Sequence, residues 1–119
     1  MPVAFVNIPS NFLGEVYRAQ GLSEVAAASE SGVLQCGEGQ LDITVQLYGT
    51  LVGATITVQG SLAGTQFTTL DDAYGQQMSY TALTPCKPVG PAVTALKIVV
   101  TGGTGVNMTA DVYMLPKRW

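Results

Sequence analysis

Hydrophobic and polar residues alternate along most of the chain beyond residue 40, and this alternation restricts the fold more than any other feature. Between Leu41 and Leu47 every second residue is aliphatic. The same two-residue period, which places successive side chains on opposite faces of a strand, recurs over residues 54–62, 95–100 and 106–115. With two shorter runs, the pattern predicts about six strands separated by turns, which is typical of an antiparallel β-sandwich or a jelly-roll-like domain.

Glycine-rich segments between these runs predict tight turns. We expect residues 49–53 and 101–105 to close two hairpins, over 41–62 and 95–115, that form the core, and Ala63-Gly64 to close a third. The side chains expected to face the core are Leu41, Ile43, Val45, Leu47, Ile56, Val58, Leu62, Met78, Tyr80, Leu96, Ile98, Val100, Met108, Ala110, Val112 and Met114.

Two further positions carry local signals. Gly60 lies inside a predicted strand, which indicates a bulge or a close approach of another segment. Residues 84–91 contain three prolines, which remove the N–H donors that a central strand needs, so we expect a long crossing loop there.

The first forty residues lack this alternation, and we interpret residues 1–40 as an N-terminal arm and residues 41–119 as the β-sandwich domain. Pro2 and Pro9 bracket a short apolar run that could form one strand. Residues 23–30 could form two helical turns with Ser23 as the cap. Because the alanines of this segment bury little area, a free-standing helix would not be stable.

Apolar anchors in the arm have no obvious place in the arm's own core. We therefore predict that Phe5, Phe12 and Tyr17 contact another chain, since a segment that orders on binding can wrap a large surface. The alternative is that the arm folds back as an edge strand over its own sheet.

Composition excludes several classes of function. Histidine, the most common general base and metal ligand, is absent, and charged residues make up 11% of the chain against about 25% in a typical domain. The net charge of −3 argues against a nucleic-acid surface, and no apolar stretch reaches the roughly 18 residues of a membrane span. The first residues lack the features of a signal peptide, so we expect synthesis in the cytoplasm without processing.

The remaining candidates for chemistry are few, and we predict no enzyme, no cofactor and no metal. The pair Asp71-Asp72 is expected to start a turn, with a calcium site as the alternative. A serine activated by Lys87 or Lys97 is the remaining route to catalysis, and no motif supports it. Two cysteines are too few for a zinc site, so we expect partly buried free thiols, with a disulfide as the alternative.

Aromatic side chains offer a possible sugar-binding face, although cross-strand packing or protein contact is the more common role of such residues in a small sheet. The candidates are Phe67, Tyr48, Tyr74, Tyr80 and Trp119.

The small number of charged side chains favours a protein that functions as part of a larger assembly. Residues 41–115 contain six charged side chains, whereas isolated sheet proteins protect their strand edges with charge, especially lysine. We expect these edges to be covered by the arm or by other chains.

The stretch DITVQLYGTLVGATITVQGSLAGTQFTTLDDAYGQQMSYTA, followed by LKIVVTGGTGVNMTADVYML, resembles a group of small β-rich virion proteins of tailed phages. The tip at residues 63–67 departs from the Asp-Gly-Gly-Trp type of turn in that group, so nothing about ligand binding at this tip carries over. The residues that carry the resemblance are Gly49, Thr50, residues 53–59, Ser61, Leu70, Asp72, Gly75 and residues 101–105.

The resemblance implies a structural role on a capsid, a head vertex or a tail, and it carries over no catalytic residue. We expect a capsid decoration (cement) protein that binds the major capsid protein on the outer surface of the virion, with sister copies forming a homotrimer. The alternatives are a tail or head-fibre protein that binds a receptor and, in another class, a free carbohydrate-binding domain.

Overall fold

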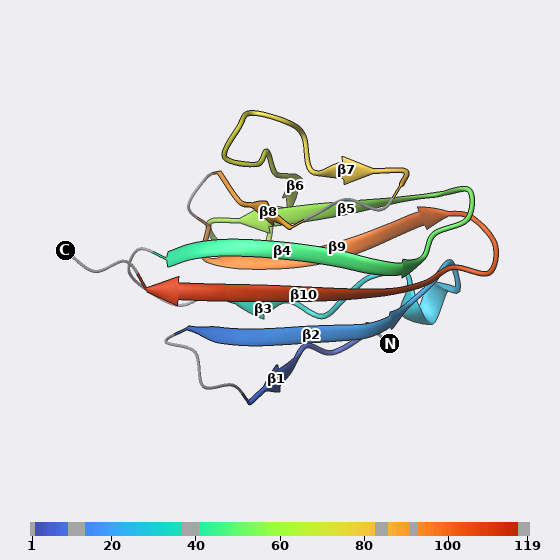
Figure 1. The fold of residues 1–119 in the computed structure, drawn as a ribbon, viewed down its shortest axis with the longest axis horizontal. Coiled ribbons are helices and arrows are strands. Elements are labelled where there is room, and N and C mark those ends of the chain that lie inside the picture. The colour runs from blue at the N-terminus through green and yellow to red at the C-terminus, as the bar shows by residue number, and fades with distance from the viewer. Residues whose placement is uncertain (1, 10–13, 37–40, 83–85, 91–92, 117–119) are drawn as a thin grey trace.

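The structure, a computed structural model, describes residues 2–9, 14–36, 41–82, 86–90 and 93–116 and shows two antiparallel five-stranded sheets packed face to face (Figure 1). The predicted all-β sandwich is confirmed. The first sheet has the order β1-β2-β10-β4-β8, and the second has the order β3-β9-β5-β6, with β7 also paired to β5. The strands are β1 (Val6–Ile8), β2 (Glu15–Leu22), β3 (Leu34–Gln35), β4 (Leu41–Thr50), β5 (Ala54–Ser61), β6 (Thr68–Thr69), β7 (Ser79–Tyr80), β8 (Lys87–Pro88), β9 (Ala95–Gly102) and β10 (Asn107–Pro116).

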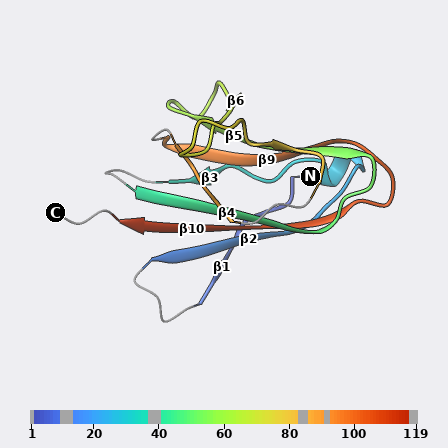
Figure 2. The same ribbon diagram turned by 45° about the horizontal axis from the view of Figure 1, so that its top comes forward.

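The core lies between the two sheets, which Figure 2 shows as separate layers. Most of the side chains that alternation assigns to the interior are buried there. Leu62 is an exception, with 75% of its surface exposed, because β5 ends at Ser61 and the chain turns away from the sheet. At Gly60 the close approach is confirmed: an added Cβ would lie 2.9 Å from the side chains of Leu70 and Val93.

The two longest predicted hairpins are wrong in their pairing. Strand β4 pairs with β10 and strand β5 pairs with β9, so the segments 49–53 and 101–105 carry the chain from one sheet to the other. The two connections lie side by side, and the Thr104 N–H donates to the Val52 carbonyl at 3.1 Å. A glycine-rich turn looks the same in sequence whether the next strand returns to its own sheet or crosses to the facing one. The turn at 63–64 does return, since β5 pairs with β6.

The described part of the first forty residues belongs to the sandwich and does not form a separate arm. Strand β2 lies between β1 and β10 in the first sheet, and β3 lies beside β9 in the second. The alternative in which this segment folds back on its own sheet is therefore the observed one, although β2 is an internal strand. Four of its side chains join the core: Ala19, Leu22, Leu34 and Cys36.

A β-bulge explains why the alternation of β2 escapes detection. The register of β2 against β10 shifts between Met108 and Thr109, next to Gly21, whose φ is 92°. This extra residue brings Ala19 and Leu22, three positions apart, to the same buried face. The segment 23–30, which could have formed two helical turns, contains one 3₁₀ turn, η1 (Ala26–Ala28).

Every edge strand of the described sheets is two or three residues long. Strands β1 and β8 end the first sheet, and β3, β6 and β7 lie at the limits of the second. Short edges leave little unpaired backbone, which is one way in which proteins limit edge-to-edge association. The proline-rich segment, expected to be a loop, supplies β8 at an edge, where a missing N–H is tolerated. Within the described ranges no helix is both long enough and apolar enough to cross a membrane.

Candidate functional site

The broadest exposed feature is the side of the first sheet that faces away from the core, which we call the outer face. Its strands β2, β10 and β4 lie side by side in front of β9 in the view of Figure 1. Along each strand its side chains alternate with those that point into the core. The outer face comprises Val6, Ile8, Val16, Arg18, Gln20, Thr44, Gln46, Tyr48, Thr109, Asp111 and Tyr113.

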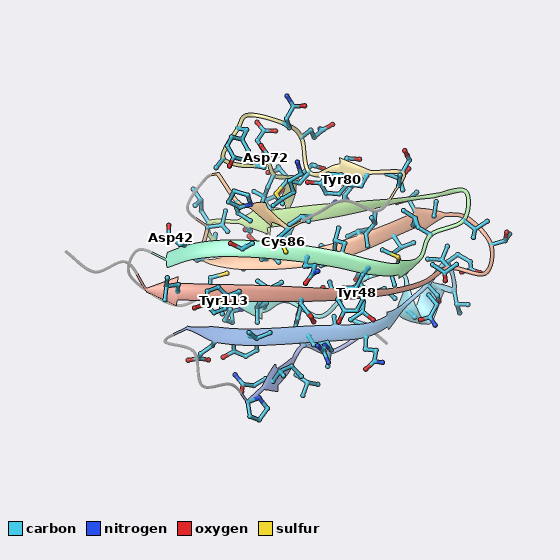
Figure 3. The ribbon with its side chains drawn as sticks, viewed as in Figure 1. Asp42, Tyr48, Asp72, Tyr80, Cys86 and Tyr113 are labelled. Atoms are coloured by element: carbon cyan, nitrogen blue, oxygen red, sulfur yellow. The ribbon has the colours of Figure 1, made fainter. Side chains whose placement is uncertain are left out.

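A hydrogen-bonded ion pair occupies the middle of the outer face. Arg18 on β2 donates from Nε to Asp111 Oδ1 at 2.8 Å and from Nη2 to Asp111 Oδ2 at 3.2 Å. Tyr48 on β4 donates its hydroxyl to Asp111 Oδ2 at 3.0 Å. Asp111 on β10 thus links three adjacent strands, and the charges of the pair cancel. Figure 3 shows Tyr48 over this part of the sheet.

The surroundings of Arg18 and Tyr48 favour the protonated form of both side chains. The hydrogen bond to Asp111 raises the pKa of Arg18. Partial burial, followed by the hydrogen bond to Asp111, raises the pKa of Tyr48, so the phenol keeps its proton at neutral pH. The three side chains are hydrogen-bonded to one another, so the network presents fixed hydrogen-bonding groups on this face.

A hollow of about 240 Å³ lies beside the ion pair, next to the edge strand β1. Val6, of which 59% is exposed, is the most open of its aliphatic residues. The residues that line the hollow are Ala4, Val6, Ile8, Arg18 and Gln20.

The structure places two of the three predicted contact residues against the protein's own core. Phe5 and Tyr17 are partly buried and pack on the core, and the Tyr17 hydroxyl donates to the Glu15 carboxylate, which raises the Tyr17 pKa. Phe12 lies outside the described residues. The contact of these residues with another chain stays a prediction, whereas their neighbours in sequence, Val6 and Arg18, face outward. The alternation of residues 16–20, which precedes the bulge at Gly21, was the signal that could have identified these neighbours.

The acidic pair forms a turn, as predicted. Asp72 is buried, and its Oδ1 accepts hydrogen bonds from the Tyr74 N–H at 2.8 Å and the Gln76 N–H at 3.0 Å, whereas Asp71 is exposed. Asp72 Oδ2 is buried and has no hydrogen-bond partner among the described residues. The charge of Asp72 adds to the effect of burial in raising the pKa of Tyr80, which lies below the same loop (Figure 3).

Nothing in the described ranges gathers three or more His, Cys, Asp or Glu side chains into a cluster that could hold a metal ion. At this loop, Asp72 is the buried carboxylate and its neighbour Asp71 is exposed.

The aromatic candidates divide between packing and exposure. The Lys97 ammonium lies 4.7 Å from the centre of the Phe67 ring, and Tyr80 packs against the core. Tyr74 is 77% exposed at the tip of the Asp72 loop, and Tyr48 lies on the outer face. Trp119 lies outside the described residues. The four described candidates therefore lie at separate places in the fold, and among them only Tyr48 belongs to the outer face.

Both cysteines are free thiols, as predicted. Cys36 is buried, and burial raises its pKa to about 11. Cys86 is exposed, contrary to the expectation of partial burial for both.

No known family, curated protein or solved structure matches this chain. The resemblance to phage virion proteins stays an expectation that rests on the residues quoted above.

Proposed function

We propose that this chain is a non-enzymatic capsid decoration protein of a tailed phage that binds the outer shell and stabilises contacts between major capsid subunits. The observation that carries the proposal is the outer face, a wide sheet surface with an internally neutralised ion pair at its centre. The resemblance of residues 42–82 and 96–115 to phage virion proteins supplies the biological setting.

The outer face has the chemistry of a protein interface. Charged residues are usually depleted from the centre of such interfaces, while Tyr and Arg are enriched. On this face the one described Arg, Arg18, is paired with Asp111, and Tyr48 and Tyr113 flank them. Burying a compensated pair costs less than burying two separate charges. A standard interface buries roughly 800 Å² of accessible surface on each partner. Contacts that are individually weak can stabilise a shell when they are repeated over many copies.

Because the edge strands of the sandwich are short, we expect a partner protein to bind a sheet face and not a strand edge. With edge strands of two or three residues, there is little free backbone for another chain to pair with, so strand addition is disfavoured. This revises the expectation that unprotected edges imply an assembly: in the described part of the chain, β2 pairs along β10 and the two-residue β3 pairs with part of β9.

Copy number in purified particles tests the proposal. Quantitative mass spectrometry of the phage that encodes this chain should give hundreds of copies per particle. About a dozen copies or fewer would contradict decoration and support a tail or vertex component. These are orders of magnitude expected from the repetition of one site over a shell.

A pair of surface variants tests the role of the outer face. Val6→Lys places a charge on the outer face and should lower occupancy on bare shells, because an unpaired ammonium would be buried on docking. Leu62→Lys changes a side chain of similar type and exposure beyond the end of β5 and should leave occupancy unchanged. Equal occupancy of the two variants would show that this face does not dock.

The second candidate function is a tail or head-fibre protein that binds a receptor, and the exposed Tyr74 favours it. The loop below Tyr74 is held by Asp72 and by a backbone hydrogen bond from Ala73 N–H to the Pro88 carbonyl at 3.0 Å. A rigid exposed tyrosine loses little entropy on binding. Binding of the isolated protein to a glycan array, lost in Tyr74→Ala, would favour this receptor function or a free carbohydrate-binding domain.

We further propose that sister copies associate as a homotrimer on the shell, because closed cyclic symmetry allows one patch to serve identical copies. Light scattering at micromolar concentration measures this directly. A monomer would leave assembly on the capsid as the only route to a trimer.

A further inference from the structure

The hollow beside Arg18 combines an aliphatic wall with hydrogen-bond donors. Ala4, Val6 and Ile8 of the β1 region form the wall, and Arg18 and Gln20 of β2 provide the polar side. Such a combination suits a short side chain that has methylene groups and a polar end.

Arg18 has donors to spare on this side. A guanidinium carries five N–H groups in a planar fork, and the two hydrogen bonds to Asp111 use two of them. The Tyr48 hydroxyl is a further side-chain hydrogen-bond partner of the guanidinium, which leaves two of the five N–H groups for other acceptors. The Arg18 side chain is 36% exposed, so water can reach these donors in the free protein.

Docking of the outer face would change the surroundings of these donors. A partner surface laid over Arg18 would remove the water and leave the remaining N–H groups of a cation unpaired unless the partner supplies acceptors. Unpaired buried donors on a charged group are among the most unfavourable features of an interface. The acceptor must therefore come from the partner.

A carboxylate is the acceptor that fits best. Its two oxygens match the planar fork of a guanidinium, and its charge makes the hydrogen bonds stronger than those to a neutral carbonyl. Asp111 already accepts two hydrogen bonds from Arg18 and one from Tyr48, and it contacts the guanidinium through Nε and Nη2. The aliphatic wall would cover the methylene groups of an acidic side chain, and the Gln20 amide can donate a further hydrogen bond.

We propose that the hollow beside Arg18 receives an acidic side chain, Asp or Glu, of the partner protein on which the outer face docks. The inference rests on the proposed function, in which that partner is the shell. Arg18 is then a specificity-determining residue, because a partner without a carboxylate at this position leaves the guanidinium unpaired.

Binding of the full chain to bare shells of the encoding phage, measured by sedimentation at about 50 mM and about 500 mM salt, tests the inference. Arg18→Lys keeps the charge and loses the fork, and it should weaken binding about tenfold or more at low salt. Arg18→Gln should weaken it further. Lys97→Gln is the matched control, because Lys97 pairs with Glu30 at 3.5 Å on the second sheet, and its binding should equal that of the wild type.

Asp111→Asn distinguishes recognition from a merely structural role of the pair. This change removes the competing internal carboxylate but keeps an oxygen acceptor, so binding at low salt should be equal to or tighter than that of the wild type. If the pair only holds the sheet in shape, Asp111→Asn should instead weaken binding as Arg18→Lys does. Thermal melting of each variant shows that the compared proteins are folded.

The outcomes separate the inference from the proposed function. Shell binding by the wild type that Arg18→Lys leaves unchanged overturns the inference and leaves the decoration role intact. An Arg18→Lys defect of the same size at both salt concentrations also overturns it, because it points to a neutral acceptor. A wild-type chain that does not bind shells at all overturns both.

Discussion

Alanine at position 103 should destabilise the sandwich more than alanine at position 105, although both glycines belong to the same short connection between β9 and β10. The comparison tests whether this connection crosses between the sheets and packs against the β4–β5 connection, as the pairing of β4 with β10 and of β5 with β9 requires. A solvent-exposed hairpin tip would tolerate the two substitutions alike.

The magnitudes follow from the space around each residue. Gly103 has φ 88°, and an added Cβ would lie 2.6 Å from both Ala54 Cβ and the Val52 carbonyl oxygen and 2.9 Å from Val106 Cγ2. Gly105 has φ 67° and no atom within 4 Å of such a Cβ. A left-handed conformation costs an alanine about 1–2 kcal/mol, and overpacking adds about 1–3 kcal/mol. Gly105→Ala should therefore cost about 1–2 kcal/mol and Gly103→Ala about 2–5 kcal/mol.

Urea denaturation followed by circular dichroism measures both free energies of unfolding. The slope of unfolding free energy against urea should be the same for the two variants, because both expose the same surface on unfolding. Losses that agree to within about 0.5 kcal/mol would refute the packed arrangement of the two connections.

Three further predictions follow from the core, the acidic turn and the thiols. Ile98→Ala should lower the free energy of unfolding by about 2–5 kcal/mol and Ile98→Val by about 1 kcal/mol, since Ile98 is fully buried; chemical denaturation measures both. Asp72→Ala removes the acceptor for two backbone N–H groups and should cost about 1–3 kcal/mol, whereas Asp71→Ala at the exposed neighbour should change the melting temperature little; calorimetry compares the two. In the native protein at pH 8 a thiol reagent should modify Cys86 but not Cys36, and in denaturant it should modify both. Folding raises the pKa of Cys36 from 9.0 to about 11, so the contribution of this thiol to stability is present below pH 9 and is lost as the pH rises towards 11. Urea titrations across this pH range would detect the loss.

Sequence alone also indicated the surface chemistry of this protein but not its site. Low charge and the lack of histidine are properties of composition and hold whatever the fold. The ion pair at the centre of the outer face joins Arg18 to Asp111 across 93 positions, and Tyr48 reaches the same carboxylate across 63. No local pattern relates residues so far apart, so prediction chose the bulky Phe5 and Tyr17, which turn out to pack inward.

Local sequence determined the long strands beyond residue 40 and which side of each is buried, because a strand with a two-residue period can hide one face only by turning it towards a core. This is why Ile43, Val45 and Leu47 on β4 are buried as expected. It could not determine which strands pair, because a glycine turn allows either a return to the same sheet or a crossing to the facing one. Only the tertiary structure decided that β4 joins β10, and that the bulge at Gly21 brings Ala19 and Leu22 of β2 into the core. In both cases the deciding energy is burial of apolar area between elements distant in sequence, which no short stretch of the chain contains.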